Sequence, residues 1–208
     1  MKPVLLVHGG AGRVPEDGGT GAREGLEVAA SLAWRVLEEG GPALEAVLAA
    51  VQALEEDPRF NAGYGSVLTE DGDVEMDAAV MDGSTLRAGA VAVVRLVRHP
   101  ILLARAVLEE GRHVLLVGGA AGGRAGSPAL PPGGAGHAGE ACTMGAGRAE
   151  QNPGTVGAVA LDRAGCLAAA SSTGGIVGKR AGRVGDSPLI GCGTYADARG
   201  AASATGDG

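Results

Sequence analysis

Hydrophobic and polar positions in the first 56 residues follow first strand and then helix spacing. Residues 4–8 form a short apolar run that stops at consecutive glycines, which is typical of a buried strand ending in a tight loop. Apolar residues then recur at helical spacing over 22–39. Pro42 follows two glycines and opens a second helical stretch that runs to about residue 56, as proline does at a first helical position. We expect one strand and then two helices in one layer.

The next segments predict a hairpin, a helix and a strand before the composition changes. Residues 74–81 and 87–97 are rich in Val and Ala and are separated by turn residues, so they predict neighbouring strands. Residues 101–110 predict a short helix and residues 113–117 another strand. From 118 to 154 the chain is mostly Gly, Ala and Pro, which bury too little apolar surface to form a core element. We predict a mobile linker there that divides the chain in two.

After the linker, residues 155–162 and 166–173 predict a second hairpin. The loop of three residues between these strands ends in Gly165, where such loops often require a left-handed backbone conformation. Antiparallel pairing centred on this loop places Thr155 opposite Thr173. Two threonines therefore meet at the open end of the hairpin.

Composition favours one globular domain that acts on a small molecule or a peptide. The 208 residues are 45% hydrophobic and 20% charged, enough for a real core. A net charge of −7 with scattered basic residues argues against a nucleic-acid partner. Three cysteines without CxxC spacing predict neither a disulfide framework nor a zinc site, and favour the cytoplasm. No apolar run reaches signal-peptide or membrane-spanning length, and we expect no membrane partner.

Chemistry could begin at the junction of the linker and the second hairpin. If the bond between Gly154 and Thr155 broke, the new amine of Thr155 could act as a base for its own hydroxyl. The preceding glycine allows the backbone strain that an N-to-O acyl shift needs. From position alone, a β-branched residue that starts a strand is the more common interpretation.

Wider motifs change that balance. The sequence GTVGAVALD at 154–162, with STGG at 172–175 and GRVGDSP at 182–188, resembles the β-chain start of the isoaspartyl peptidase and plant-type asparaginase family. The resemblance covers nearly the whole chain outside the linker, with the motifs in the same order. It also includes HGGAG at 8–12, FNAG at 60–63, MDA at 76–78, MDG at 81–83 and GAVA at 89–92.

The resemblance implies a four-layer αββα sandwich of the N-terminal nucleophile hydrolase type, in the α+β class. It also implies self-cleavage after Gly154, which would divide the single domain 1–208 into an α-chain, 1–154, and the start of a β-chain, 155–208. Relatives continue beyond residue 208 with further strands and helices, so we expect the sandwich to be incomplete in this chain. Two cleaved protomers are expected to form a homodimer.

Catalytic roles follow position by position from the resemblance. Thr155 matches the nucleophile, and Thr173 matches the hydroxyl beside it that helps to activate it. Thr205 and Gly206 match the oxyanion hole, in which donors aimed at the developing negative oxygen lower the barrier. No organic cofactor is needed for this chemistry.

Substrate and ion contacts follow in the same way. Arg183 matches the group that binds the substrate α-carboxylate, and Asp186 the one that receives the α-ammonium, as a planar fork and an anion would suit these groups. Asn61 matches an asparagine that approaches the substrate, Gly208 is a further substrate-binding candidate, and Ser187 is a weaker one. Main-chain carbonyls that match a sodium-holding loop belong to Leu54, Glu55, Asp57, Phe60, Ala62 and Tyr64, and oxygen ligands of this kind suit a hard cation.

The predicted activity is hydrolysis of isoaspartyl (β-aspartyl) dipeptides and L-asparagine, with release of aspartate. Two alternatives stay open: a glycosylasparaginase-like amidase, and an inactive, truncated asparaginase-like protein. The glycine pattern at 134–139 formally fits a dinucleotide motif, but no strand precedes it, so we disfavour dinucleotide binding. Serine-hydrolase chemistry is disfavoured because the chain has no GxSxG motif.

Overall fold

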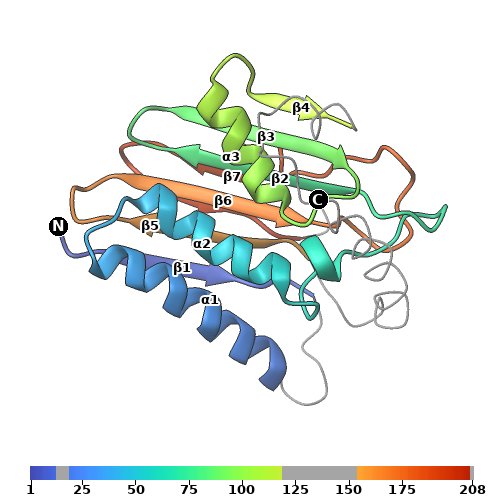
Figure 1. Ribbon diagram of the computed structural model, residues 1–208, viewed down its shortest axis with the longest axis horizontal. Coiled ribbons are helices and arrows are strands. Elements are labelled where there is room, and N and C mark those ends of the chain that lie inside the picture. Colours follow the sequence, from blue (N-terminus) through green and yellow to red (C-terminus); the bar gives the residue numbers. More distant parts are fainter. Residues whose placement is uncertain (13–18, 119–153, 207–208) are drawn as a thin grey trace.

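The computed structural model describes residues 1–12, 19–118 and 154–206 (Figure 1). The linker predicted at 118–154 therefore falls outside the described residues, apart from its two ends. In chain order the elements are β1 (Val4–His8), α1 (Thr20–Glu38), α2 (Ala43–Glu56), the short helix η1 (Gly63–Gly65), β2 (Met76–Asp82), β3 (Arg87–Val94), α3 (Pro100–Glu110), β4 (Leu115–Val117), β5 (Val156–Leu161), β6 (Leu167–Thr173), β7 (Thr194–Ala196) and β8 (Ala201–Ser203).

Six strands form one sheet in the order β1-β5-β6-β2-β3-β4. The predicted hairpins β2–β3 and β5–β6 are confirmed, and the register of the second is the predicted one, with Leu161 opposite Leu167 and Val156 opposite Ser172. Gly165 in its loop has φ +87°, the left-handed conformation expected there. Both strands of the second hairpin lie in the middle of the sheet, between β1 and β2. The segments before and after 119–153 therefore share one sheet.

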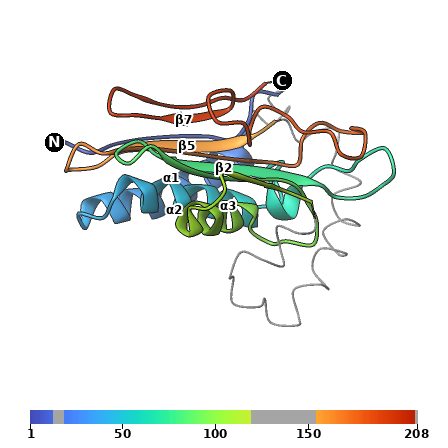
Figure 2. The same cartoon turned by 90° about the horizontal axis from the view of Figure 1, so that it is seen from above.

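Helices cover one face of this sheet, and the two-stranded sheet β7–β8 lies against the other face (Figure 2). The main core lies between helices and sheet and includes the fully buried Leu37, Leu54, Val80 and Val91. Small residues bring the layers close together. A Cβ atom on Gly89 would lie 2.1 Å from the carbonyl oxygen of α3 residue 104, so α3 packs directly on the backbone of β3.

The predicted mixed architecture, a central sheet flanked by helices, is confirmed. In the residues that the structure describes, the second sheet consists of β7 and β8, and all three α-helices lie on the opposite face of the larger sheet. These residues thus form three layers, which are the helices, the six-stranded sheet and the two-stranded sheet.

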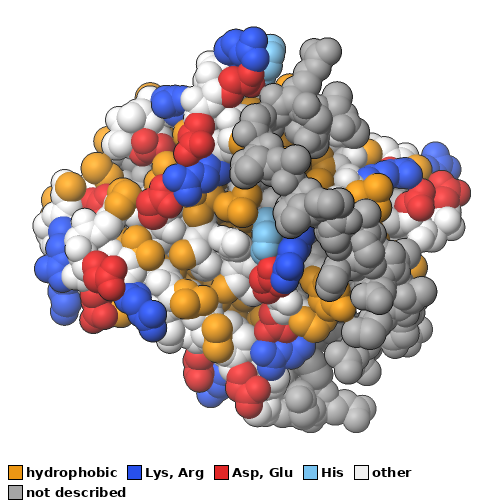
Figure 3. Space-filling model, in the orientation of Figure 1, with side chains coloured by type: hydrophobic (Ala, Val, Ile, Leu, Met, Phe, Trp, Pro, Cys, Tyr) orange, Lys and Arg blue, Asp and Glu red, His pale blue; other side chains and the backbone are white. Residues whose placement is uncertain are grey.

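Charge is mixed on the helical face. Lys and Arg side chains are interspersed there with Asp and Glu (Figure 3), and Arg105 of α3 pairs with Glu45 of α2 at 2.7 Å.

Cys166 and Cys192 are free thiols, whereas Cys142 lies outside the described residues. Within the described ranges, no helix combines the length and the apolar character needed to cross a membrane.

Candidate active site

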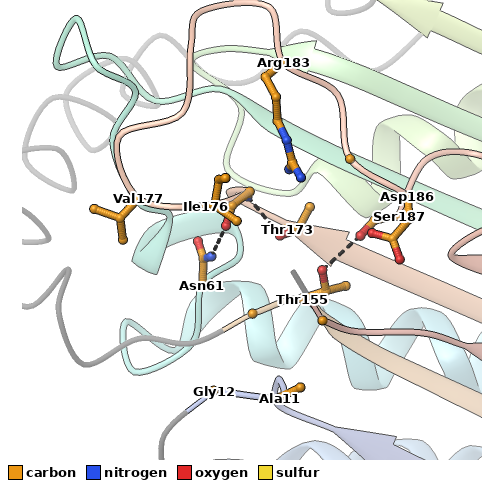
Figure 4. A pocket seen from close by; sticks show the side chains of 14 residues that line it. Ala11, Gly12, Asn61, Thr155, Thr173, Ile176, Val177, Arg183, Asp186 and Ser187 are labelled. Atoms are coloured by element: carbon orange, nitrogen blue, oxygen red, sulfur yellow. Dashed lines mark hydrogen bonds between the residues drawn. The ribbon is translucent and has the colours of Figure 1, made fainter. Parts of the chain in front are cut away.

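A cavity of about 240 Å³ lies where β5 begins and β6 ends (Figure 4). Its walls come from the loop after β1, the start of β5, the end of β6 and the long loop between β6 and β7. Eight predicted site residues line it: Asn61, Gly154, Thr155, Thr173, Arg183, Asp186, Ser187 and Gly206. It also exposes residues that had no predicted role, namely Ala11, Gly12, Gly175, Ile176, Val177 and Gly185. Gly208 lies outside the described residues.

Thr155 is held rigidly at the wall of this cavity. It directly precedes β5, which is paired with β1 on one side and β6 on the other, and the residue is only 5% exposed. The Thr155 Oγ1 atom lies 3.0 Å from the Oγ atom of Ser187, which is fully buried. The sequence placed Ser187 on the substrate side, and the structure puts it in contact with the predicted nucleophile.

Thr173 lies in the same cavity wall. The β5–β6 register runs to Val156 opposite Ser172, so the next position along brings Thr173 to the side of Thr155, as the hairpin predicted. The Thr173 hydroxyl accepts a hydrogen bond from the Gly175 N–H at 2.9 Å. In this arrangement Ser187 is the hydrogen-bond partner of Thr155, and Gly175 is that of Thr173.

Thr205 packs against the bond predicted to break. Gly154 has φ +90°, and a Cβ atom there would lie 2.9 Å from both Thr205 Oγ1 and the Ala11 amide nitrogen. Thr205 Oγ1 is buried and has no hydrogen-bond partner among the described residues. A buried hydroxyl without a partner is costly, which suggests that Thr205 Oγ1 has a partner in the functional state. From its place beside Gly154 it could donate to an oxygen on which negative charge develops.

Two opposite charges reach the cavity from the loop after β6. Figure 4 shows the Arg183 side chain directed toward Thr173, and Asp186 close to Ser187. A guanidinium and a carboxylate in one small cavity suit a ligand that carries both an anionic and a cationic group.

Asn61 contributes mainly to the shape of the cavity. Its Nδ2 donates to the Gly175 carbonyl at 2.6 Å, and its Oδ1 accepts the Val67 N–H at 3.1 Å. The Nδ2 end of the side-chain amide therefore ties this loop to the turn that follows β6, and the Oδ1 end closes the loop on itself. Its remaining N–H is the group that a substrate could use.

The loop 54–65 folds tightly around main-chain oxygens. Cβ atoms on Gly63 and Gly65 would lie 2.5 Å from the Glu55 carbonyl oxygen and 2.1 Å from that of Phe60. The Leu54, Asp57, Phe60 and Ala62 carbonyls each accept one backbone N–H, which leaves each a second lone pair. Within the described ranges, no group of three or more His, Cys, Asp or Glu side chains could hold a metal ion. The donor type fits the predicted hard monovalent cation.

A buried chain of hydroxyls runs between the two sheets next to the site. The His8 Nε2 atom lies 2.8 Å from Ser203 Oγ, which lies 2.8 Å from Ser171 Oγ. Thr194 Oγ1 lies 2.8 Å from Ser171 Oγ and 3.0 Å from the Ser187 carbonyl oxygen. Burial lowers the pKa of His8, because the charged ring loses its hydration. The network links β1, β6, β7 and β8 to the loop that carries Ser187.

Comparison with known proteins identifies the family of this chain. A family model described as asparaginase matches residues 1–131 and 135–208. The chain is 47% identical to the isoaspartyl peptidase/L-asparaginase of Macaca fascicularis, across 100% of this chain and 72% of the relative. The human protein of that name gives the same figures, and the Danio rerio protein is 45% identical across 100% of this chain and 71% of its own.

The cavity brings together a buried threonine and two opposite charges, and the unpartnered Thr205 hydroxyl lies beside Gly154 in its wall; such an arrangement suits a hydrolase site. The chain belongs to the isoaspartyl peptidase/L-asparaginase family of hydrolases, as its motifs predicted.

Proposed function

We propose that this chain is a threonine amidohydrolase that cleaves itself before Thr155 and then hydrolyses isoaspartyl dipeptides and L-asparagine. The observation that carries the proposal is the place of Thr155. Its buried hydroxyl lies 3.0 Å from Ser187, directly after a glycine in a left-handed conformation and beside the unpartnered hydroxyl of Thr205. The names of the relatives support the substrate class.

In the proposed self-cleavage, the Thr155 hydroxyl oxygen attacks the carbonyl carbon of Gly154. The Thr205 hydroxyl donates to the oxygen of the tetrahedral intermediate, and the peptide nitrogen leaves with the proton of the nucleophile. Water then hydrolyses the resulting ester, which releases the Gly154 carboxylate and restores the Thr155 hydroxyl next to the amine freed in the shift. Glycine at 154 permits this geometry, because any side chain there would clash with the surrounding backbone at the left-handed φ of this residue.

In the proposed turnover, the free amine of Thr155 takes the proton of its hydroxyl, and the oxygen attacks the side-chain carbonyl of the substrate. Thr205 and the Gly206 amide stabilise the oxyanion. Arg183 binds the α-carboxylate, and Asp186 binds the α-ammonium. The amine of Thr155 returns the proton to the leaving nitrogen, and water releases aspartate from the acyl-enzyme.

Further parts of the proposal rest on family resemblance. They are the complete αββα sandwich, a cytoplasmic homodimer of cleaved protomers, and a sodium ion that stabilises the loop 54–65. The Leu54, Glu55, Asp57, Phe60, Ala62 and Tyr64 carbonyls would hold that ion. Sedimentation analysis tests the dimer, and replacing sodium by choline while following the thermal midpoint tests the ion.

A denaturing gel of the wild type and Thr155→Ala tests the central step. We expect two fragments split before residue 155 for the wild type and one intact band for the variant. A single band for both proteins contradicts self-cleavage and favours the inactive alternative. The cleaved protein is then assayed with a β-aspartyl dipeptide, L-asparagine and glycosylasparagine. Faster turnover of the last would reassign the chain to the glycosylasparaginase-like class.

A further inference from the structure

Behind the cavity lies a buried acid that the proposed mechanism does not use. Asp77 of β2 has no exposed surface, and its partner in the β2–β6 register is Thr173. Asp77 therefore lies on the strand next to Thr173, and Thr155 lies at the start of the strand beyond that one. Buried carboxylates are rare unless they have specific partners.

One oxygen of Asp77 stabilises a bulge in β3. Met76 pairs with Val94 and the next paired position is 78 with 91, so two residues of β3 face Asp77 alone. Val93 in this bulge has φ +55°, an unfavourable conformation for a β-branched residue. The Val93 N–H donates to Asp77 Oδ1 at 2.8 Å, which satisfies the amide that the bulge removes from the ladder.

The other oxygen faces the loop of the two substrate-binding charges. The Gly185 N–H, between Arg183 and Asp186 in the sequence, lies 3.5 Å from Asp77 Oδ2, a long contact at the limit of hydrogen bonding. A Cβ atom on Gly185 would lie 2.9 Å from the Arg183 guanidinium, so this guanidinium folds back over the Gly185 backbone. The Gly185 backbone thus lies next to the Asp77 carboxylate through its N–H and next to the Arg183 guanidinium on the side where a Cβ atom would be.

A second buried charge completes the cluster. Lys179 is 3% exposed and donates from Nζ to the Glu75 carbonyl at 2.7 Å. Burial lowers the pKa of Lys179, while Asp77 and Glu75 raise it and Arg183 lowers it. Burial raises the pKa of Asp77, and the bond from Val93 and the two cations act against this rise. Lys179 and Arg183 therefore both favour the charged form of Asp77, and Asp77 in turn favours the charged form of Lys179.

We infer that Asp77 is a positioning residue for substrate binding, which holds the Gly185 backbone and balances Lys179 so that the Arg183 guanidinium points into the cavity. The inference rests on the proposed function, because that function assigns the substrate α-carboxylate to Arg183. A purely structural Asp77, acting on the bulge alone, would affect stability without a selective effect on substrate affinity.

Asp77→Asn separates these two roles. The amide keeps the shape and an oxygen for the Val93 N–H, but it loses the charge and presents an N–H where the Gly185 N–H needs an acceptor. The matched control is Asp82→Asn at the other end of β2, where the carboxylate accepts from Ser84 and Thr85 away from the cavity.

The measurements are KM and kcat for L-asparagine, and the Kd for L-aspartate by calorimetry. We expect Asp77→Asn still to cleave itself, with kcat within about threefold of the wild type. KM and Kd should each rise by about tenfold. This factor corresponds to the lower end of the free energies found when a hydrogen bond to a charged group is lost. Asp82→Asn should match the wild type in all three values. Wild-type values of KM and Kd in Asp77→Asn overturn the inference, even if its thermal midpoint falls.

Failure of the proposed function gives a different result. A wild type that neither cleaves itself nor turns over asparagine contradicts that function, whereas the aspartate titration still tests Asp77. Absence of aspartate binding to the wild type overturns the inference as well.

If Asp77→Asn does not fold, Lys179→Met carries the test. Without Lys179, the Asp77 carboxylate attracts the Arg183 guanidinium more strongly and draws it away from the cavity. The aspartate Kd should therefore rise by at least about threefold. An unchanged Kd overturns the inference.

Discussion

The hydroxyls of Thr155 and Ser187 lie 3.0 Å apart in a wall of the cavity, although 32 residues separate them in the sequence. Ser187 is itself fixed, because its carbonyl accepts a hydrogen bond from Thr194. The nucleophile proposed for this hydrolase therefore has a fixed partner that can orient its hydroxyl for the proposed self-cleavage.

Ser187→Ala should slow self-cleavage. Loss of one hydrogen bond of about 1 kcal/mol corresponds to a rate about fivefold lower, because the Thr155 hydroxyl then samples other rotamers. The measurement is the time course of fragment formation on a denaturing gel after refolding. Ser31→Ala is the control, since Ser31 is exposed and donates only to the Glu27 carbonyl within α1. Equal rates for the two variants would show that Ser187 does not orient the nucleophile.

Gly154→Ala should leave much of the chain uncut. At φ +90° an alanine is strained, by about 1–2 kcal/mol, and its Cβ would lie 2.9 Å from the Ala11 amide and from Thr205 Oγ1. The backbone must rotate to relieve this clash, which turns the scissile carbonyl away from the Thr155 hydroxyl. We expect cleavage to be slower by about tenfold or more.

The control for that substitution is Gly200→Ala, because a Cβ atom at residue 200 meets no atom within 4 Å. The same gel assay applies to both variants. Cleavage of Gly154→Ala at the rate of Gly200→Ala would mean that the conformation of residue 154 does not matter to the reaction.

Local features of this chain could be predicted from its sequence, and contacts between distant segments could not. The pairing that brings Thr155 to Thr173 follows from the length and centre of one hairpin loop, because register is a local property. The contact between Thr155 and Ser187 depends instead on the path of a glycine-rich loop. Its residues carry no periodic signal, so this contact had no signature in the sequence beyond the family motif.

Buried acids show the same limit. Glu55 lies near the end of a helical pattern, where a polar residue is ordinary, and Asp77 lies within a strand motif. Neither position reveals that its carboxylate is fully buried. The bulge opposite Asp77 belongs to the pairing of β2 with β3, which the spacing within either strand does not reveal.

Glu55→Gln should change stability in a pH-dependent way. The Glu55 carboxylate accepts from Ser172 at 2.6 Å and from the Ile101 N–H at 2.9 Å, yet burial raises its pKa above the usual range of a glutamate. The contribution of Glu55 to stability is thus full below the unfolded-state pKa and is lost as pH rises through the folded-state pKa. Glutamine cannot ionise. The free energy of unfolding of the variant, minus that of the wild type, should increase between about pH 4 and about pH 8.

Urea unfolding at both ends of that range measures the difference. Glu56→Gln is the matched variant with the opposite sign, because a hydrogen bond from Arg98 lowers the pKa of Glu56. The contribution of Glu56 is present at higher pH and is lost as pH falls through its folded-state pKa, so this variant should lose stability, relative to the wild type, as pH rises. If the two variants change in the same direction, the electrostatic explanation is wrong.

Thr194→Val should weaken the hydroxyl network between the sheets. Thr194 is 1% exposed, and its Oγ1 lies 2.8 Å from Ser171 Oγ and 3.0 Å from the Ser187 carbonyl. Valine keeps the shape of the side chain and removes both contacts, which leaves the Ser187 carbonyl without this donor. We expect the free energy of unfolding to fall by about 1–2 kcal/mol, and fragment formation to slow because the Ser187 loop is less fixed.

Thr85→Val is the control for this last variant. Thr85 is exposed and its hydroxyl donates to Asp82 in a turn, so its replacement should change the free energy of unfolding by less than about 0.5 kcal/mol. Urea unfolding compares both variants with the wild type, and the gel assay follows cleavage. If Thr194→Val lost stability but cleaved at the wild-type rate, the network would stabilise the sheets without positioning Ser187. If it lost neither, Thr194 would have no part in holding the site together.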